Sequence, residues 1–326
     1  MATKISGSAL IGIVLVSLAL VPACSDGTGS GEVIAAKCGS GGPLTGPGGD
    51  ATGPYMERTL VMDTGEERSY LLRLPADYDP TQRADVVFTF HGAGSSMLQQ
   101  LAYSDFMALA DRDQVILVSP DANKIYDYSG NPLGDYWSSA WEANLRERDF
   151  DVDFIRQLVN GVQDEYCTGD FFAAGMSAGG DISSAFQCLQ DSPFKAHAPV
   201  TYAYYNSDEC RDAPPRPMIY FHGTADFIVP FDGQGAPWFD PPVPELMQNW
   251  AAHNGCNPVA SEDAISPEVT RYSYNECTAA VTWYKVTGGG HTWPGGVPFP
   301  VLGLTTEDID ASELIWAWFF GTSPSS

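Results

Sequence analysis

The stretch "FFAAGMSAGGDIS" at residues 171–183 constrains the fold more than any other part of this chain. An apolar run ends in a glycine, a serine follows between small residues, and a segment with helical character comes next. A buried strand that turns sharply into a helix at the pattern G-x-S-x-G presents its serine as a nucleophile. The chain contains 33 glycines, so the pattern alone is weak. The neighbouring segments must decide whether Ser177 is a nucleophile or only a helix N-cap.

Apolar runs typical of buried strands alternate with segments of helical spacing along most of the chain. We expect strands in "DVVFTFHG", "QVILVSPDA", "FFAAGMS", "KAHAPVTYA", "RPMIYFHGTAD" and "AVTWYKVTGGGH", and helices in "SDFMALADRD", "DVDFIRQLVNGVQDEY", "GGDISSAFQCLQ" and "TEDIDASELIWAWFF". In the last helix, Asp310 and Glu313 have the spacing of an N-cap and its partner. Residues 59–75 predict a hairpin, and residues 230–250 predict an insertion above the sheet. The alternation predicts an α/β fold with a mostly parallel central sheet and helices on both faces.

The amino-terminal residues predict export. Lys4 precedes an apolar stretch that is too short to span a membrane, so residues 1–23 are predicted to be a signal peptide. Val21-Pro22-Ala23-Cys24 resembles the lipobox of bacterial lipoproteins, although Pro22 departs from it and leaves simple cleavage after Ala23 as the alternative. Residues 24–54 are a Gly- and Ser-rich tether, and residues 55–326 form one domain. We expect a bacterial lipoprotein at the cell surface or in the periplasm, anchored at Cys24, or a secreted protein.

Charge and cysteine content restrict the partners. The formal net charge is −25, from 16 basic and 41 acidic residues, which disfavours nucleic acid as a partner. Without Cys24, an even set of six cysteines remains for an exported protein. These are Cys38, Cys167, Cys188, Cys210, Cys256 and Cys277. Their spacing favours disulfides over zinc, and we expect no metal and no cofactor.

One pairing of cysteines is favoured. Cys256 and Cys277 flank a polar stretch with little apolar content to hold it, so we expect a disulfide between them. Six cysteines allow 15 connectivities, and pairing of either one with Cys188 or Cys210 stays open.

Three residue types of nucleophilic catalysis follow three predicted strands in order. Ser177 follows "FFAAG", Asp226 ends "MIYFHGTAD", and His291 follows "VTWYKV" and three glycines. Serine needs an imidazole to accept its proton, and a carboxylate orients that imidazole. The order Ser, Asp, His is that of the α/β-hydrolases. Asp232 is a nearby rival for the acid.

An oxyanion hole needs two backbone N–H groups. In this fold one comes from the residue after the nucleophile and one from the loop after the third strand, which indicates Ala178 and Ala93. His91 and His222 both stand in "FHG" at strand ends, and structural hydrogen bonds explain them better than a catalytic role does.

Four motifs resemble those of a known family. "FHGAG", "GMSAGG", "YFHGTADFIVPF" and above all "GGGHTWPGG" resemble the polyhydroxybutyrate-depolymerase-like esterases, exported α/β-hydrolases akin to feruloyl and acetylxylan esterases of carbohydrate esterase family one. The resemblance covers about residues 60–320. It implies a nucleophile at Ser177, an acid at Asp226, a base at His291 and an oxyanion loop at residues 91–94. Many members have Cys in place of Ala93 and Asn after the nucleophile, and backbone N–H donation survives both changes.

The expected function is that of an exported serine esterase that cleaves carboxylic esters through an acyl-enzyme, on polyesters of the polyhydroxybutyrate type. One alternative is a feruloyl or acetylxylan esterase acting on plant polysaccharide. Another is a non-catalytic, lipid-anchored binding protein on a hydrolase scaffold. Trp293, Trp137 and Trp141 are candidates for substrate binding if exposed, with packing as the equal alternative. We expect no large lid, a monomer, and no membrane contact except through Cys24.

Overall fold

The computed structural model describes residue 38 and residues 55–126, 132–137, 145–234 and 241–322. The predicted signal peptide, Cys24, Trp141 and all of the tether except Cys38 lie outside the described residues. Within the described ranges no helix combines the length and the apolar character that crossing a bilayer requires.

Ten strands form one sheet in the order β1-β2-β4-β3-β7-β8-β9-β12-β11-β10. The five pairings from β4 to β12 are parallel, and the pairs at both edges are antiparallel. This confirms the predicted mostly parallel sheet and the predicted hairpin at its beginning. The strands are β1 (Met56–Val61), β2 (Glu67–Arg73), β3 (Ala84–Phe90), β4 (Ile116–Pro120), β7 (Thr168–Met176), β8 (Phe194–Val200), β9 (Met218–Gly223), β10 (Ala260–Ala264), β11 (Val269–Tyr274) and β12 (Val281–Val286).

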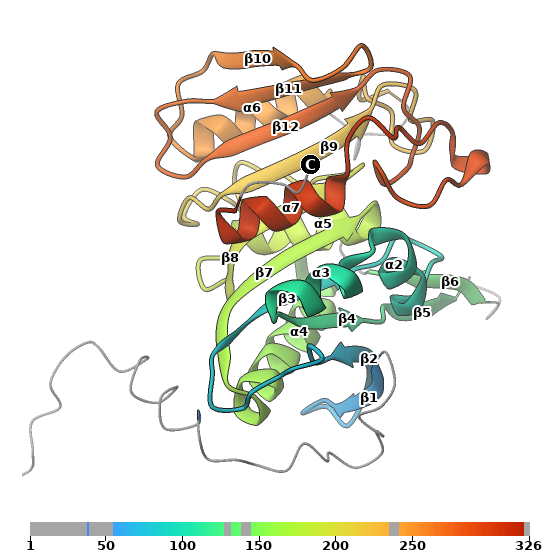
Figure 1. Ribbon diagram of the computed structural model, residues 1–326, viewed down its shortest axis with the longest axis vertical. Helices are drawn as coiled ribbons and strands as arrows, with labels where there is room; N and C mark the ends of the chain where they lie inside the picture. The colour runs from blue at the N-terminus through green and yellow to red at the C-terminus, as the bar shows by residue number, and fades with distance from the viewer. Residues whose placement is uncertain (1–37, 39–54, 127–131, 138–144, 235–240, 323–326) are drawn as a thin grey trace, which may run out of the picture.

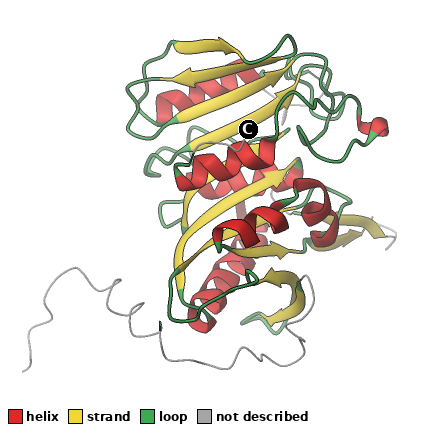
Figure 2. Ribbon diagram, viewed as in Figure 1, coloured by secondary structure: helices red, strands yellow, loops and turns green. Residues whose placement is uncertain are grey.

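Helices cover both faces of this sheet (Figures 1 and 2). One face is covered by α2 (Met97–Ser104), α3 (Phe106–Asp113) and α7 (Ala311–Phe320). The other is covered by α4 (Leu145–Glu165), α5 (Ala178–Ala185) and α6 (Val243–His253). Two short 3-10 helices, η2 (Phe186–Cys188) and η4 (Pro300–Leu302), and a separate hairpin of β5 (Asn123–Tyr126) and β6 (Pro132–Tyr136) complete the elements.

The continuous apolar runs of the central strands reflect burial on both faces. In β3, Val87 packs in the cluster that contains Phe106 of α3, whereas Val86 and Phe88 pack in the cluster that contains Phe154 of α4. Successive side chains of a strand point to opposite faces, so a strand covered on both sides needs apolar residues at nearly every position.

Two segments differ from the prediction. Residues 243–253, expected within an insertion above the sheet, form α6, whose Leu246, Met247 and Trp250 pack against the sheet at helical spacing. The stretch between Cys256 and Cys277, expected to be a loop, forms the hairpin β10–β11 at the sheet edge. An edge strand exposed at four of its five positions has no apolar stripe, so β10 carried no strand signal in the sequence.

All six cysteines of the even set are paired. The disulfides are Cys38–Cys167, Cys188–Cys210 and Cys256–Cys277, so the favoured pairing is confirmed. The first ties the tether to the residue before β7. The third closes the β10–β11 hairpin just ahead of β12, the strand that leads to His291.

Removing the third disulfide tests its contribution to stability. Replacing Cys256 and Cys277 by serine opens a loop with a sequence separation of 21. In the chain-entropy model we expect the free energy of unfolding to fall by about 3 kcal/mol, because the denatured chain regains its freedom. Urea unfolding of the oxidised wild type and the double variant measures this. Equal unfolding free energies would show that the Cys256–Cys277 disulfide does not stabilise the protein.

The burial of His197 predicts that the folded protein is less stable at acidic pH. His197 of β8 is fully buried, and burial, aided by the charge of Arg216, lowers its pKa from 6.5 to about 3. Between these values the unfolded chain binds a proton that the folded chain excludes, so stability falls as pH drops through this window. We expect the unfolding free energy of the wild type to fall relative to that of His197→Gln by up to about 1.4 kcal/mol per pH unit. Urea unfolding at several pH values tests it, and parallel curves for the two proteins would contradict it.

Candidate active site

Ser177 occupies the sharp turn between β7 and α5. Its φ of 56° and ψ of −122° lie in a region that side chains rarely adopt, as a nucleophile elbow requires. The turn is tight enough to bring α5 onto the backbone of β3, where a Cβ on Gly179 would lie 2.0 Å from the carbonyl oxygen of Phe90. Only glycine fits at that position, so the small residues around the serine are a steric requirement.

The three candidate residues all follow the carboxyl ends of central strands, so they lie on the same side of the sheet. The N–H of Ser177 donates to the carbonyl of Val200 at the end of β8, at 2.8 Å. On the far side of β9, the N–H of Thr224 donates to the carbonyl of Val286 at the end of β12, also at 2.8 Å. The candidate nucleophile, acid and base follow β7, β9 and β12, so all three lie at the carboxyl edge where open α/β sheets bind ligands.

Asp226 and His291 form a buried pair. The Nδ1–H of His291 donates to Oδ2 of Asp226 at 2.8 Å, and the backbone N–H groups of Ile228 and Val229 donate to Oδ1 at 2.9 Å each. These bonds hold the carboxylate and leave Nε2 of the imidazole free to accept a proton. Among the described residues no hydrogen bond joins the hydroxyl of Ser177 to Nε2 of His291, and catalytic hydrogen bonds are often long before substrate binds.

His222 is a second imidazole beside the same carboxylate. Its Nε2 lies 3.5 Å from Oδ2 of Asp226 and donates to the carbonyl of Val229 at 2.9 Å, while the Tyr220 hydroxyl donates to Nδ1. Burial lowers the pKa of His222 to about 4, so the ring is neutral at neutral pH. Both nitrogens are occupied and the side chain is sealed from solvent, which agrees with the predicted structural role.

The candidate oxyanion loop packs against Ser177, the candidate nucleophile. A Cβ on Gly92 would lie 3.3 Å from the Cβ of Ser177, so the loop after β3 passes directly over the elbow. Ala178 is the first residue of α5 and directly follows the serine. This arrangement brings together the segments that carry the N–H groups of Ala93 and Ala178, our candidate donors.

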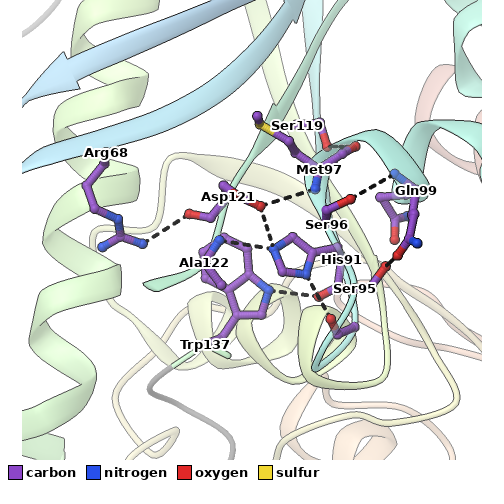
Figure 3. Close-up of polar contacts among 12 residues, drawn as sticks. Arg68, His91, Ser95, Ser96, Met97, Gln99, Ser119, Asp121, Ala122 and Trp137 are labelled. Carbon is purple, nitrogen blue, oxygen red and sulfur yellow. Dashed lines mark hydrogen bonds and ion pairs between the residues drawn. The ribbon is translucent and has the colours of Figure 1, made fainter. Parts of the chain in front are cut away.

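A buried hydrogen-bond network holds the start of this loop (Figure 3). His91 donates from Nδ1 to the carbonyl of Gly92 at 2.8 Å, and its Nε2 accepts the N–H of Ala122 at 3.0 Å. The carboxylate of Asp121 lies 3.2 Å from the same Nε2. The indole N–H of Trp137 donates to the carbonyl of His91 at 2.8 Å. These bonds agree with a structural role for His91, and they link the loop to the residues after β4.

Two of the candidate substrate-binding tryptophans serve packing. Trp137 is 1% exposed and contacts Phe90 edge-on, and Trp293 is 3% exposed with its indole N–H bonded to Ser312 of α7 at 2.9 Å. Neither lines an open cleft in this structure, so the packing alternative holds for both. The third, Trp141, lies outside the described residues.

Among the described residues no group of three or more His, Cys, Asp and Glu side chains could hold a metal ion.

Comparison with known proteins identifies esterases as similar. No family model matches the chain. The chain is 25% identical over 283 residues to probable feruloyl esterase C of Aspergillus oryzae, covering 83% of this chain and 92% of that protein. It is 26% identical over 266 residues to feruloyl esterase C of Emericella nidulans, covering 78% and 88%. Neither of these two relatives is named a polyhydroxybutyrate depolymerase.

A solved structure shows the fold. An acetyl xylan esterase from Aspergillus awamori superposes with a TM-score of 0.56 at 15% identity, over 76% of this chain and 96% of that one. The fold is that of the α/β-hydrolases, as the order of the candidate residues predicted.

Two aspartates provide a matched test of the candidate acid. Asp226→Asn removes the charge that orients His291 and favours the wrong tautomer, so we expect turnover of p-nitrophenyl butyrate to fall about a thousandfold or more. Asp232 is exposed six residues later, and Asp232→Asn makes the same chemical change there. We expect its turnover to stay within about twofold of the wild type. The reverse ranking would assign the acid to Asp232.

Proposed function

We propose that this protein is a serine carboxylic ester hydrolase with Ser177 as nucleophile, His291 as base and Asp226 as the orienting acid. The observation that carries the proposal is the 2.8 Å bond between Asp226 and His291, at the sheet edge where the elbow places Ser177. A binding protein on the same scaffold has no use for a buried carboxylate that holds an imidazole in one tautomer. Burying an ionised carboxylate is costly unless it is paired and hydrogen-bonded.

The proposed reaction has two steps. His291 accepts the hydroxyl proton through Nε2 as Ser177 attacks the ester carbonyl, and the resulting oxyanion accepts hydrogen bonds from the N–H groups of Ala93 and Ala178. The imidazolium then gives its proton to the departing alcohol, leaving an acyl-serine. In the second step His291 accepts a proton from water as the water oxygen attacks the carbonyl of the acyl-serine. The bond to Ser177 Oγ then breaks, His291 returns the proton to Oγ, and the carboxylic acid is released. Asp226 keeps its negative charge throughout and stabilises the imidazolium.

The relatives favour esters on polysaccharide over polyesters as substrates. Both sequence relatives carry the name feruloyl esterase, and the similar structure is an acetyl xylan esterase. We therefore place esters of hydroxycinnamic or acetic acid on plant polysaccharide first among substrates. This reverses the order expected from the sequence, which placed polyesters first.

Polyesters remain the second candidate because of one observation. Large apolar side chains are exposed on both loops beside the acid and the base, among them Phe227 and Phe299. Exposed apolar side chains of this kind mark interaction sites, and an apolar polyester suits them.

Export is supported by the three disulfides, since such bonds persist in oxidising compartments. Lipid attachment at Cys24 remains a proposal from the sequence.

Three substrates and one variant test the proposed function. We expect the wild type to hydrolyse p-nitrophenyl butyrate, and Ser177→Ala to lose about a thousandfold or more of that turnover, because the triad acts as a unit. Methyl ferulate and a polyhydroxybutyrate film, assayed in parallel, rank the hydroxycinnamic and the polyester candidates. Unchanged melting of Ser177→Ala shows that the fold is intact. Full activity in that variant would remove Ser177 from the mechanism.

A further inference from the structure

Five residues other than glycine have a positive φ in the described part of the chain. Three of them, Asp105, Gln114 and Glu276, lie at exposed positions. The other two are Ser177, with a φ of 56°, and Thr201, with a φ of 64°, and their atoms are hydrogen-bonded to each other. A positive φ is unfavourable for a residue that carries a side chain. Two unfavourable conformations therefore meet at the elbow.

Thr201 is the more unusual of the two, because its side chain branches at Cβ. It is 1% exposed and follows Val200, the last residue of β8. Glycine adopts a positive φ readily, whereas a β-branched residue rarely does. Strain of this kind persists only where the surrounding structure holds it, and it gathers at functional sites. We therefore asked what the threonine side chain does that glycine could not.

The hydroxyl of Thr201 lies between the end of β8 and the elbow. It donates to the carbonyl of Val200 at 2.7 Å and accepts the backbone N–H of Ser177 at 3.2 Å. The same N–H also donates to the carbonyl of Val200 at 2.8 Å. The amide of the candidate nucleophile is thus shared between two acceptors, and the hydroxyl is bonded to both of the groups that it joins.

The backbone around Thr201 is held from two sides. The N–H of Thr201 donates at 2.8 Å to the carbonyl of Phe221 in β9, the strand that precedes the candidate acid. On the other side, a Cβ on Gly180 would lie 2.3 Å from the carbonyl oxygen of Tyr202, so α5 begins directly against the residue after Thr201. These contacts fix the position from which the hydroxyl reaches Ser177.

We propose that Thr201 is a positioning residue for the nucleophile: its hydroxyl holds the amide of Ser177 and so keeps the elbow in the conformation that presents Oγ. The inference rests on the proposed function of Ser177. Thr201 acts through the backbone of Ser177 and not on the reacting atoms. A displacement of a reacting group by about 1 Å can lower a rate about a hundredfold, so a small change in the elbow is enough to matter.

Two substitutions separate positioning from packing. Thr201→Val keeps the branched shape but removes the hydroxyl, and it leaves the N–H of Ser177 bonded to the carbonyl of Val200. Thr201→Ser keeps the hydroxyl but removes a buried methyl group. Thr168→Val is the matched control, because it makes the same chemical change at a buried threonine at the opposite end of β7.

We expect activity and stability to rank the two Thr201 variants in opposite orders. Thr201→Val should keep the unfolding free energy of the wild type but lose about tenfold or more of kcat on p-nitrophenyl butyrate, with KM within about twofold. Thr201→Ser should unfold at lower urea concentration, because a buried methyl group is lost, but keep kcat within about threefold. Thr168→Val should keep kcat within about twofold.

A second readout needs no catalysis. In protein with isotope-labelled serine, NMR follows exchange of the Ser177 amide hydrogen with solvent. We expect this exchange to be about fivefold faster in Thr201→Val than in the wild type, because one hydrogen bond to the amide is lost. The control Thr168→Val should leave it unchanged.

Two results would overturn the proposal. Full turnover in Thr201→Val, or unchanged exchange of the Ser177 amide in that variant, would show that the hydroxyl does not hold the elbow. Losses of kcat that follow the losses of unfolding free energy across the variants would assign Thr201 a purely structural role and also overturn it. An inactive wild type would instead refute the proposed function, and the exchange measurement would still decide whether Thr201 holds the amide.

Discussion

A backbone contact that only glycine allows underlies the active site. Gly179 lets α5 begin directly against the end of β3, at the carbonyl of Phe90. That contact places the elbow serine at the start of α5 beside the loop that continues β3, whose Gly92 packs on Ser177. One close approach therefore brings together the proposed nucleophile and the segment proposed to hold the oxyanion. A side chain at Gly179 would separate them, because its Cβ would lie 2.0 Å from the carbonyl oxygen of Phe90.

The carboxylate of Asp226, the candidate acid, is buried, and its stability there depends on hydrogen bonds. Asp226 accepts hydrogen bonds from His291 and from two backbone N–H groups, which offsets the cost of removing its carboxylate from water. A second imidazole, His222, lies beside it, yet burial keeps that ring neutral. His222 also holds the carbonyl of Val229, in the turn whose N–H groups clamp Asp226. It supports the acid without competing for its charge.

Enclosed tryptophans and exposed apolar residues have different roles at this end of the sheet. Trp137 and Trp293 are enclosed, and their indole N–H groups tie the oxyanion loop and the base loop to their surroundings. The exposed apolar residues come instead from the loops at 227–228 and 297–304. The enclosed tryptophans thus belong to the framework of the candidate site, and the exposed apolar surface comes from other residues.

Local patterns in the sequence determined the central sheet, the elbow and the order of the candidate triad. Strand, turn and helix at Ser177 are set by neighbouring residues, and strands buried on both faces carry continuous apolar runs. Only the tertiary structure decided the rest. The hairpin β10–β11 has an edge strand without apolar periodicity, so its pairing with β12 is set by a neighbour distant in sequence. The burial of Trp137 and Trp293 depends on helices and loops that no local pattern reveals. The tertiary structure also decides that the apolar side chains at residues 227–228 and 297–304 are exposed near one another. Their two loops are hydrogen-bonded to the glycines before His291, and no local pattern predicts that contact.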